Sequence, residues 1–228
     1  MILVNFFSMV LIMDIVLLLI AFVLVLYFTV NMVTTYSETL YIQSDIDSKR
    51  YIIRRGHTKN EGYLKESANT LAEINSRVTK LIDHLSKKYE KDPKRNYFIR
   101  KLKENYNPYI LSEAAIDERY TTYTVDKQDM HVCLRTRDKM ENIYDINLLM
   151  YVILHELAHL CNYDDLGNPI QGHGPEFKNI FKLLVIEAIR LKLYDYVDYS
   201  ETPREYCGIV ISTTILPRFE YNFHMQNE

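Results

Sequence analysis

The first 33 residues form an apolar run that limits how this chain can fold. The run reads MILVNFFSMVLIMDIVLLLIAFVLVLYFTVNMV, and Asp14 is its only charged residue. A helix needs roughly 20 apolar residues to cross a bilayer, and residues 15–33 with those before Asp14 supply them. A signal peptide, the alternative, would have a basic start, a shorter apolar core and small residues at a cleavage site, and we find none of these. We therefore expect residues 1–33 to be an uncleaved, single-pass transmembrane anchor.

Charge and cysteine content favour a cytoplasmic location for the rest of the chain. No Lys or Arg precedes the apolar run, and four basic residues follow it: Lys49, Arg50, Arg54 and Arg55. The positive-inside rule then places the C-terminal domain in the cytoplasm. The three cysteines are far apart and form no CxxC pair, which argues against a zinc ribbon and against a disulfide framework. With unpaired cysteines, a reducing compartment is expected.

Composition divides the remaining chain into three parts. Residues 34–62 are polar, lack a clear period and predict a linker that contains a short strand at residues 51–53. Residues 63–219 hold the longer periodic segments and predict one domain, which is long enough for its own hydrophobic core. Residues 220–228 predict a C-terminal tail.

Hydrophobic periodicity predicts both helices and strands in this domain. Apolar stripes and boundary residues predict helices over residues 67–89, between Pro93 and Pro108, over 146–163 and over 175–194. Asp145 is the expected N-cap of the third helix, and Pro175 opens the fourth. The segments YTTYTV and MHVCLR predict a β-hairpin or two adjacent strands, and YCGIVISTTIL predicts a final strand.

Net charge does not select a partner, because the formal value is only −3. Residues 77–103 are nevertheless rich in Lys and Arg, which is typical of a surface for nucleic acid or anionic lipid. A solvated helix face has the same composition. We favour that second interpretation, since the segment lacks the interleaved aromatic residues of a single-strand binding platform.

The helix predicted over residues 146–163 carries three titratable residues in an apolar setting, LMYVILHELAHLCNY. His155 and His159 are four residues apart, so their imidazoles project from one helix face, one turn apart. That spacing lets both bind one Zn²⁺ at about 2.0–2.1 Å. Glu156 can then hold the zinc-bound water and take its proton as general base. Because HExxH is a short pattern, two hydrogen-bonded core histidines are the alternative.

A catalytic zinc typically has three protein ligands and one open position. His173, in GHGPEF, is the expected third ligand, because Gly172 and Gly174 allow the backbone to turn sharply. Asp165 is the competing candidate, since it stands where a compact HExxHxxGxxH/D pattern would place its last ligand. Asn162 occupies the position of the turn-making glycine in that pattern, which favours His173. Asp164 and Asp165 are expected to accept a hydrogen bond from a ligand imidazole or to be surface charges.

These residues carry a resemblance to known peptidases. HELAH, followed after a loop by GHGPEFK, resembles the SprT-like (Spartan) metalloproteases, whose pattern is HExxH, a loop and HGxxF. The segment from MHVCLRTRDK to LLMYVILHELAHL is similar to the WLM metallopeptidases, in which a strand ending in Leu-Arg precedes the active-site helix. The resemblance covers residues 130–182 well and residues 71–216 loosely.

The resemblance implies an α+β fold of the zincin type, a short sheet plus an active-site helix, here behind the N-terminal transmembrane helix. It implies zinc ligation by His155, His159 and His173, with Glu156 as general base. Both families are associated with cleavage of proteins crosslinked to DNA, so DNA association is implied by family resemblance only. This chain has no C-terminal zinc ribbon and no evident DNA-binding appendage, and it carries a membrane anchor instead.

The leading hypothesis is a membrane-anchored zinc metallopeptidase that hydrolyses peptide bonds in protein substrates. An extended substrate is expected to add along the strand at residues 131–134. The alternative is a catalytically inert, zinc-stabilised and membrane-tethered binding module, with or without nucleic acid. Glu156 favours the enzyme, because a structural zinc site has no need of a glutamate at that position.

Overall fold

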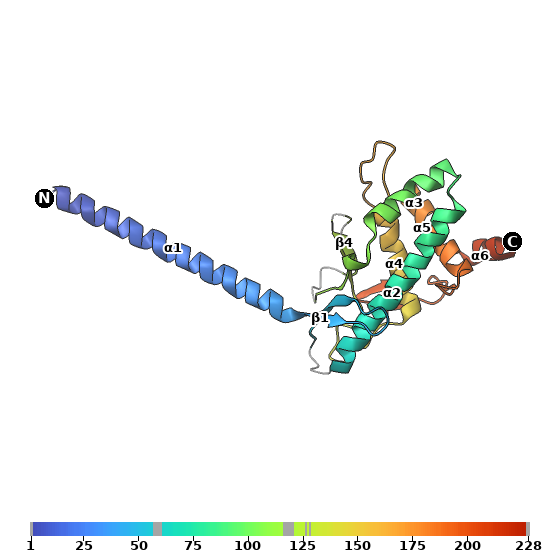
Figure 1. The fold of residues 1–228 in the computed structure, drawn as a ribbon, viewed down its shortest axis with the longest axis horizontal. Helices are drawn as coiled ribbons and strands as arrows, with labels where there is room; N and C mark the ends of the chain where they lie inside the picture. Colours follow the sequence, from blue (N-terminus) through green and yellow to red (C-terminus); the bar gives the residue numbers. More distant parts are fainter. Residues whose placement is uncertain (1, 57–60, 116–120, 126, 128, 227–228) are drawn as a thin grey trace. The chain divides into compact units, whose positions relative to one another are not determined.

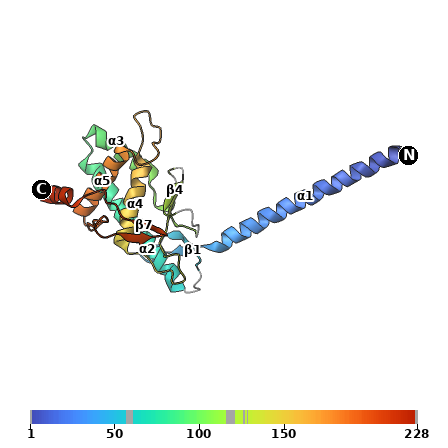
Figure 2. The same ribbon diagram turned by 180° about the vertical axis from the view of Figure 1, so that it is seen from behind.

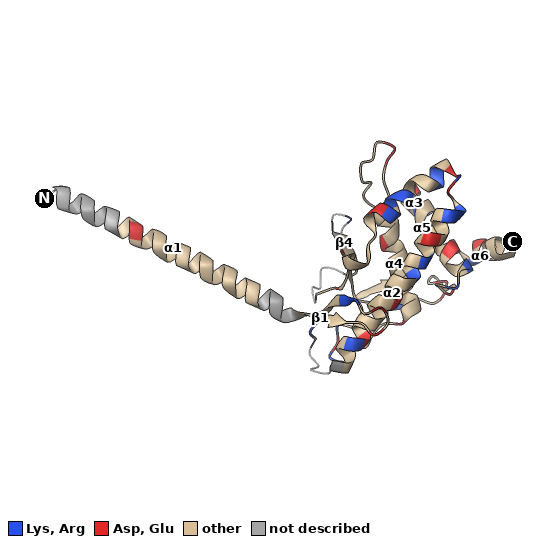
Figure 3. Cartoon of the chain, in the orientation of Figure 1, with Lys and Arg blue, Asp and Glu red and all other residues tan. Residues whose placement is uncertain are grey.

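The computed structural model describes residues 2–56, 61–115, 121–125, 127 and 129–226, and it separates into two units, Met1–Leu40 and Tyr41–Glu228. The first unit contains helix α1, Ile2–Glu38. Within it, Ile12–Val33 has a mean hydropathy of 2.7 and is long and apolar enough to cross a membrane. Along residues 12–33, the part of α1 whose side chains are described, Asp14 is acidic and no residue is basic, in agreement with the colouring of Figure 3. Length and hydropathy alone do not separate such a helix from an N-terminal signal sequence.

The second unit is built around a mixed sheet of five short strands. The strands are β1 Thr39–Gln43, β2 Arg50–Arg54, β3 Leu111–Glu113, β4 Tyr123–Val125 and β5 Asp129–Val132. Their order is β1-β2-β3-β5-β4, with β2, β3 and β5 parallel and β4 antiparallel to β5. The predicted adjacent strands are therefore β4 and β5. The expectation that residues 131–134 form an edge is wrong, because β5 lies between β3 and β4, and β4 is the edge strand.

Five helices and a second, two-stranded sheet complete this unit (Figures 1 and 2). The helices are α2 Glu61–Lys88, α3 Pro93–Asn105, α4 Ile146–Cys161, α5 Pro175–Arg190 and α6 Arg218–Gln226, with a 3₁₀ turn at Pro108–Ile110. Strands β6 Arg204–Tyr206 and β7 Ile209–Ile211 form an antiparallel hairpin. Helix α4 packs against α3 and α5, and α2 packs against β2 and β3. The described residues thus form a mixed α and β fold in which α4 is a central helix.

Three parts of the sequence prediction differ from this fold. The short strand predicted at residues 51–53 is confirmed as part of β2, where Tyr51 and Ile53 are buried in the core, but the segment predicted as a linker also contributes β1 to the sheet. The predicted tail forms most of α6. The predicted final strand is a hairpin, because Cys207 and Gly208 adopt positive φ angles of 50° and 84° and reverse the chain.

A buried group of charges joins the ends of β2, β3 and β5. Arg135 donates to both carboxylate oxygens of Glu113, at 2.7 and 3.0 Å. Arg54 and Glu141 complete the group, with a contact of 3.4 Å between the Arg54 guanidinium and the Glu141 carboxylate. Gly56 lies against this group with a φ of +69°, a conformation that favours glycine, and a Cβ there would lie 2.6 Å from Glu141 Oε2. Two positive and two negative side chains balance, which permits their burial.

A second buried carboxylate attaches α5 to α2. Glu187, on α5, accepts hydrogen bonds from His84 and Lys88 of α2 and from Tyr89, just after α2, each at 2.9 Å, and from Arg190 at 2.8 Å. Desolvation alone would raise the pKa of Glu187, but these donors outweigh it and lower the pKa to about 2. The carboxylate therefore stays charged and fixes the helix that begins beside the predicted metal site.

The expectation of unpaired cysteines is wrong. Cys133, just after β5, and Cys207, in the turn between β6 and β7, form a disulfide with their Cα atoms 6.5 Å apart. The two are separated by 74 residues in sequence, so their spacing gave no sign of the pairing. Cys161 is buried and free, and desolvation raises its pKa to about 12. The argument for a reducing compartment loses its basis.

This disulfide can be tested by counting thiols. In denatured but unreduced protein, we expect one cysteine, Cys161, to react with an alkylating reagent, and all three to react after reduction. Mass spectrometry of the alkylated protein gives both counts. Three reactive thiols without reduction would contradict the pairing.

Candidate metal centre

Helix α4 is fixed at both ends. The Asp145 carboxylate caps its N-terminus by accepting hydrogen bonds from the backbone N–H groups of Asn147 and Leu148, at 2.9 and 3.2 Å. Between the caps, the apolar side of α4 is fully buried. At the C-terminus, the Lys127 ammonium donates to the carbonyl oxygens of His159 and Asn162. A cation there also interacts favourably with the helix dipole.

His155 and His159 project from the same face of α4, as their spacing predicts. Their Nε2 atoms lie 3.2 Å apart. Desolvation, with the neighbouring histidines, lowers the pKa of His155 to about 3. Desolvation also lowers the pKa of His159 to about 4. Both imidazoles are therefore neutral at pH 7, which is the state that binds metal ions.

The loop between α4 and α5 returns His173 to this pair. The backbone N–H of Ile170 donates to the carbonyl of Asn162 at 3.0 Å, which closes the loop at its base. Gly172 then adopts a φ of +77°, a conformation that favours glycine, and redirects the chain. As a result, His173 Nε2 lies 3.0 Å from the Nε2 atoms of both His155 and His159.

Hydrogen bonds alone do not explain this triangle of nitrogens. Each imidazole Nε2 is either an N–H donor or a lone-pair acceptor. Among three nitrogens at least two have the same role, so three mutual hydrogen bonds cannot form. One cation facing three lone pairs removes the conflict, and two nitrogens that share a tetrahedral Zn²⁺ lie about 3.3 Å apart. The three histidines, whose ligand atoms lie within 4.8 Å of one another, therefore fit a metal ion.

Phe177 supports all three imidazoles. Its ring centroid lies 4.9 Å from that of His155, 4.3 Å from that of His159 and 4.7 Å from that of His173. Phe177 is in the first turn of α5 and is buried. The sequence placed it only in an apolar stripe, although it is also the last residue of the HGxxF pattern.

Glu156 lies beside these histidines and is 7% exposed. Its Oε2 accepts a hydrogen bond from the hydroxyl of Thr124, in strand β4, at 2.9 Å. Desolvation raises the pKa of Glu156 to about 7, and the Thr124 hydrogen bond opposes this shift. A cation bound at His155 would favour the carboxylate further. Sequence reasoning missed Thr124, because only the fold brings it to α4.

A cavity of about 780 Å³ opens onto the histidines and Glu156. Strand β4 and the segment before it line one side, through Thr122, Tyr123 and Thr124. Lys127 also lines it, with its ammonium 4.4 Å from the Tyr163 ring centroid. Among the described residues, the outer edge of β4 has no partner strand. The site therefore combines metal-binding side chains, a buried carboxylate and a free strand edge.

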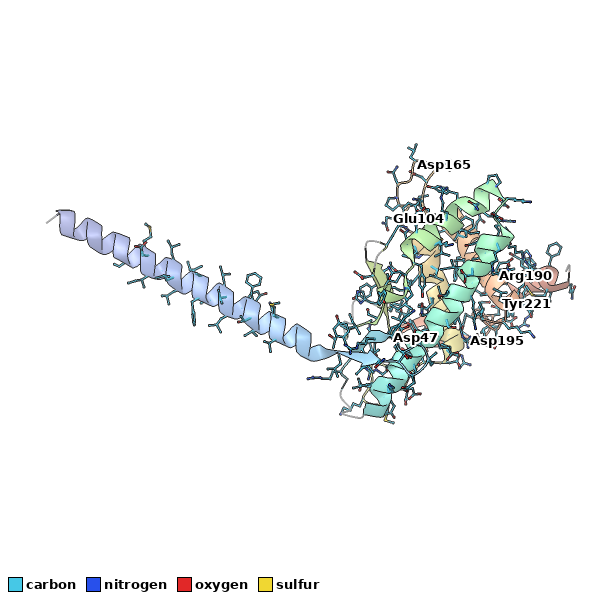
Figure 4. All side chains as sticks on the ribbon, viewed as in Figure 1. Asp47, Glu104, Asp165, Arg190, Asp195 and Tyr221 are labelled. Carbon is cyan, nitrogen blue, oxygen red and sulfur yellow. A yellow bond between two sulfur atoms is a disulfide. The ribbon has the colours of Figure 1, made fainter. Side chains whose placement is uncertain are left out.

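The structure keeps Asp164 and Asp165 away from the imidazoles. The Asp164 carboxylate accepts hydrogen bonds from the backbone N–H groups of Leu166 and Asn168, at 3.0 and 2.7 Å, and shapes the loop instead. Asp165 is exposed on the same loop (Figure 4) and is not in the histidine group. Neither aspartate accepts from a ligand imidazole in the described structure.

The basic segment, residues 77–103, contains ten Lys and Arg residues, and half of them are paired with acidic residues. Five of its side chains form ion pairs with Asp or Glu: Arg77, Lys88, Arg95, Arg100 and Lys101. Arg77 also donates to the carbonyl oxygen of Leu193 at 2.7 Å. These contacts favour a structural helix surface and give no specific support to a nucleic-acid site.

Comparison with known proteins finds viral relatives. The chain is 38% identical over 200 residues to uncharacterized protein R325 of Acanthamoeba polyphaga mimivirus, across 87% of this chain and 94% of the relative. It is 37% identical over 91 residues to uncharacterized protein 136R of Invertebrate iridescent virus 6, across 39% of this chain and 47% of that protein. Uncharacterized protein 042R of Invertebrate iridescent virus 3 is 38% identical over 87 residues, 38% of this chain and 50% of that protein. No protein-family model and no solved structure matches the chain.

Proposed function

This chain belongs to the same family as uncharacterized protein R325 of Acanthamoeba polyphaga mimivirus, and we propose that it is a membrane-anchored zinc metallopeptidase. One observation carries the proposal: three imidazole nitrogens, 3.0–3.2 Å apart, converge beside a buried glutamate in an open cavity. The resemblance of HELAH and GHGPEFK to SprT-like and WLM peptidases agrees with it.

His155, His159 and His173 would hold the zinc ion. When bound, zinc supplies Lewis-acid polarisation of a carbonyl group and makes water more acidic. Glu156 accepts the proton of the attacking water and transfers it to the leaving amine of the cleaved peptide. The Thr124 hydroxyl fixes the Glu156 carboxylate for this role, since it donates to Oε2 at 2.9 Å.

The proposed substrate is an extended segment of a protein. A peptide can add its backbone to the outer edge of β4, next to which the described residues form no further strand, in the manner of strand addition. Because Thr124 is in β4 and contacts Glu156, such a peptide would lie beside the catalytic carboxylate. The cavity, of about 780 Å³, has room for several residues of an extended peptide.

The proposal is tested by measuring the metal content of the purified chain together with its cleavage of an unfolded protein substrate. We expect about one zinc per chain and cleavage that a chelator removes and added zinc restores. A chain that retains zinc but cleaves nothing would support the alternative, an inert zinc-stabilised binding module.

We further propose that α1 remains attached as the membrane anchor. Alkaline carbonate washing should then leave the full-length chain in the membrane pellet, because a spanning helix resists extraction. N-terminal sequencing of the membrane-bound protein then shows whether the apolar helix has been removed. A mature N-terminus close to residue 34 would show that the apolar helix is a cleaved signal instead.

Two features indicate on which side of the membrane the second unit lies. The charge rule indicates the cytoplasm, but Arg54 is one of its four charges and is buried against Glu113 and Glu141. The Cys133–Cys207 disulfide indicates an oxidising compartment. We therefore favour the oxidising side for the second unit. Protease protection in sealed vesicles distinguishes the two orientations.

A further inference from the structure

A second cavity, of about 490 Å³, adjoins the proposed catalytic site and has a different lining. Its floor is α4, through Tyr151, Val152, His155 and Glu156, and Phe181 of α5 also contributes. His155 and Glu156 line both cavities. The second cavity therefore begins where the first presents its reactive groups and continues over apolar and aromatic side chains, with hydroxyl groups from Thr121, Thr122, Ser212 and Thr213 also in its lining.

Strand β7, which is labelled in Figure 2, contributes side chains to the lining of this cavity and exposes apolar residues. Ile209 is 48% exposed and Val210 is 63% exposed, and Ile211 is partly buried. Among the described residues, β7 pairs only with β6, so its other edge is free. Three consecutive apolar residues along such an edge do not serve the core, but they suit contact with an apolar ligand.

The β6–β7 hairpin, which forms this wall of the cavity, is attached to the five-stranded sheet by a disulfide and by hydrogen bonds. The disulfide joins the hairpin turn at Cys207 to Cys133, which follows β5. The buried hydroxyl of Tyr206 donates to the carbonyl of Cys133 at 2.9 Å and lies in hydrogen-bonding contact with the hydroxyl of Thr122. On the opposite side of the turn, the Cys207 N–H donates to the Tyr144 hydroxyl at 2.8 Å. These contacts make the hairpin a preformed surface.

We propose that this cavity is a specificity subsite that binds one bulky apolar side chain of the substrate, such as Leu, Met or Phe, at a residue next to the cleaved bond. The inference rests on the proposed function, because it takes the ligand to be an extended peptide. Its position follows from the shared residues His155 and Glu156, and its preference follows from β7 and the aromatic floor. Burying such a side chain favours binding by about 10- to 100-fold over a polar residue.

Peptide binding tests the subsite separately from catalysis. The protein is the full chain in lipid nanodiscs, loaded with zinc and carrying Glu156→Gln so that the probes stay intact. The probes are two fluorescent decapeptides that differ only in a central Leu or Asp. We expect the Leu peptide to bind at least ~10-fold more tightly.

Variants of the wall identify where the preference arises. Val210→Asp should reduce the ratio of the two affinities to within about 3-fold, because it places a charge against the apolar side chain. The matched control is Phe219→Ser on α6, an apolar residue that is 72% exposed and does not line the cavity. It should leave the ratio unchanged. Replacing both Cys133 and Cys207 by Ala should also reduce the ratio, since the wall loses its covalent attachment.

The outcomes separate this inference from the proposed function. Equal affinities for the two peptides, or a Leu preference that survives Val210→Asp, would overturn the subsite. A Leu preference that disappears in Val210→Asp supports it. If that preference is found but the parent chain with Glu156 cleaves neither peptide, the subsite stands as a binding site and the peptidase proposal fails.

Discussion

Replacement of Glu156 by Gln is expected to lower peptide hydrolysis by at least ~100-fold without loss of metal. Glutamine keeps the volume and the helix propensity of the side chain, and it can still accept the Thr124 hydrogen bond. It cannot take a proton from water, and positioned general acid–base groups contribute about 10²–10⁴-fold to rates. Initial rates of cleavage and zinc content, measured on the same preparation, give the two quantities.

The control is Glu176→Gln. Glu176 is close to His173 in sequence, but it lines a different cavity, together with Tyr97 and Asp165. It should cleave like the parent. If Glu156→Gln also cleaves like the parent, the proposed mechanism is wrong even if zinc is bound at the three histidines. A loss of zinc in Glu156→Gln would mean that the carboxylate helps to hold the metal.

Removal of any one imidazole from the triangle is expected to lower zinc retention severely. His155→Ala and His159→Ala each leave two protein ligands, fewer than the three of a typical catalytic zinc site. We expect zinc to fall from about one per chain to near zero after dialysis, and cleavage to fall with it. Elemental analysis after dialysis measures this, and circular dichroism checks that α4 is intact.

His173→Ala tests the third ligand, with Asp165→Ala as its matched control on the same loop. His173 Nε2 is 3.0 Å from both other nitrogens, whereas Asp165 is exposed and outside the histidine group. Zinc retention should therefore fall in His173→Ala and stay at the parent level in Asp165→Ala. The opposite ranking would assign the third position to Asp165. Full retention in the His155→Ala, His159→Ala double variant would place the zinc elsewhere.

Local patterns were sufficient to predict the main helices. The positions of α4 and α5 follow from Asp145, Pro175 and their apolar periodicity, because caps and helical spacing act within a few residues. The same local logic brought His155 and His159 together, since four residues are close to one helical turn. The apolar composition of α1 was equally plain from the sequence.

The strand order and the disulfide could not be predicted in this way. Strand β5 became internal because β3, which is separated from it by a long segment, pairs with its other side. Cys133 and Cys207 are 74 residues apart, and nothing near either one marks the other as its partner. Strands β1 and β2 were predicted mostly as linker because the sheet that holds them is completed by the pairing of β2 with β3, which is distant in sequence.

The sequence by itself determined the apolar helix, the amphipathic helices and the HExxH spacing, because each depends on residues within a turn or two of one another. Only the tertiary structure brought His173 to within 3.0 Å of His155 and His159, placed Phe177 beneath all three rings and joined Thr124 to Glu156. It also decided that β4 is an edge strand of the sheet formed by the described residues and that β7 exposes apolar residues beside the site. The physical reason is that these contacts join segments far apart along the chain, whose approach is stabilised by the packing of the whole core rather than by any local pattern.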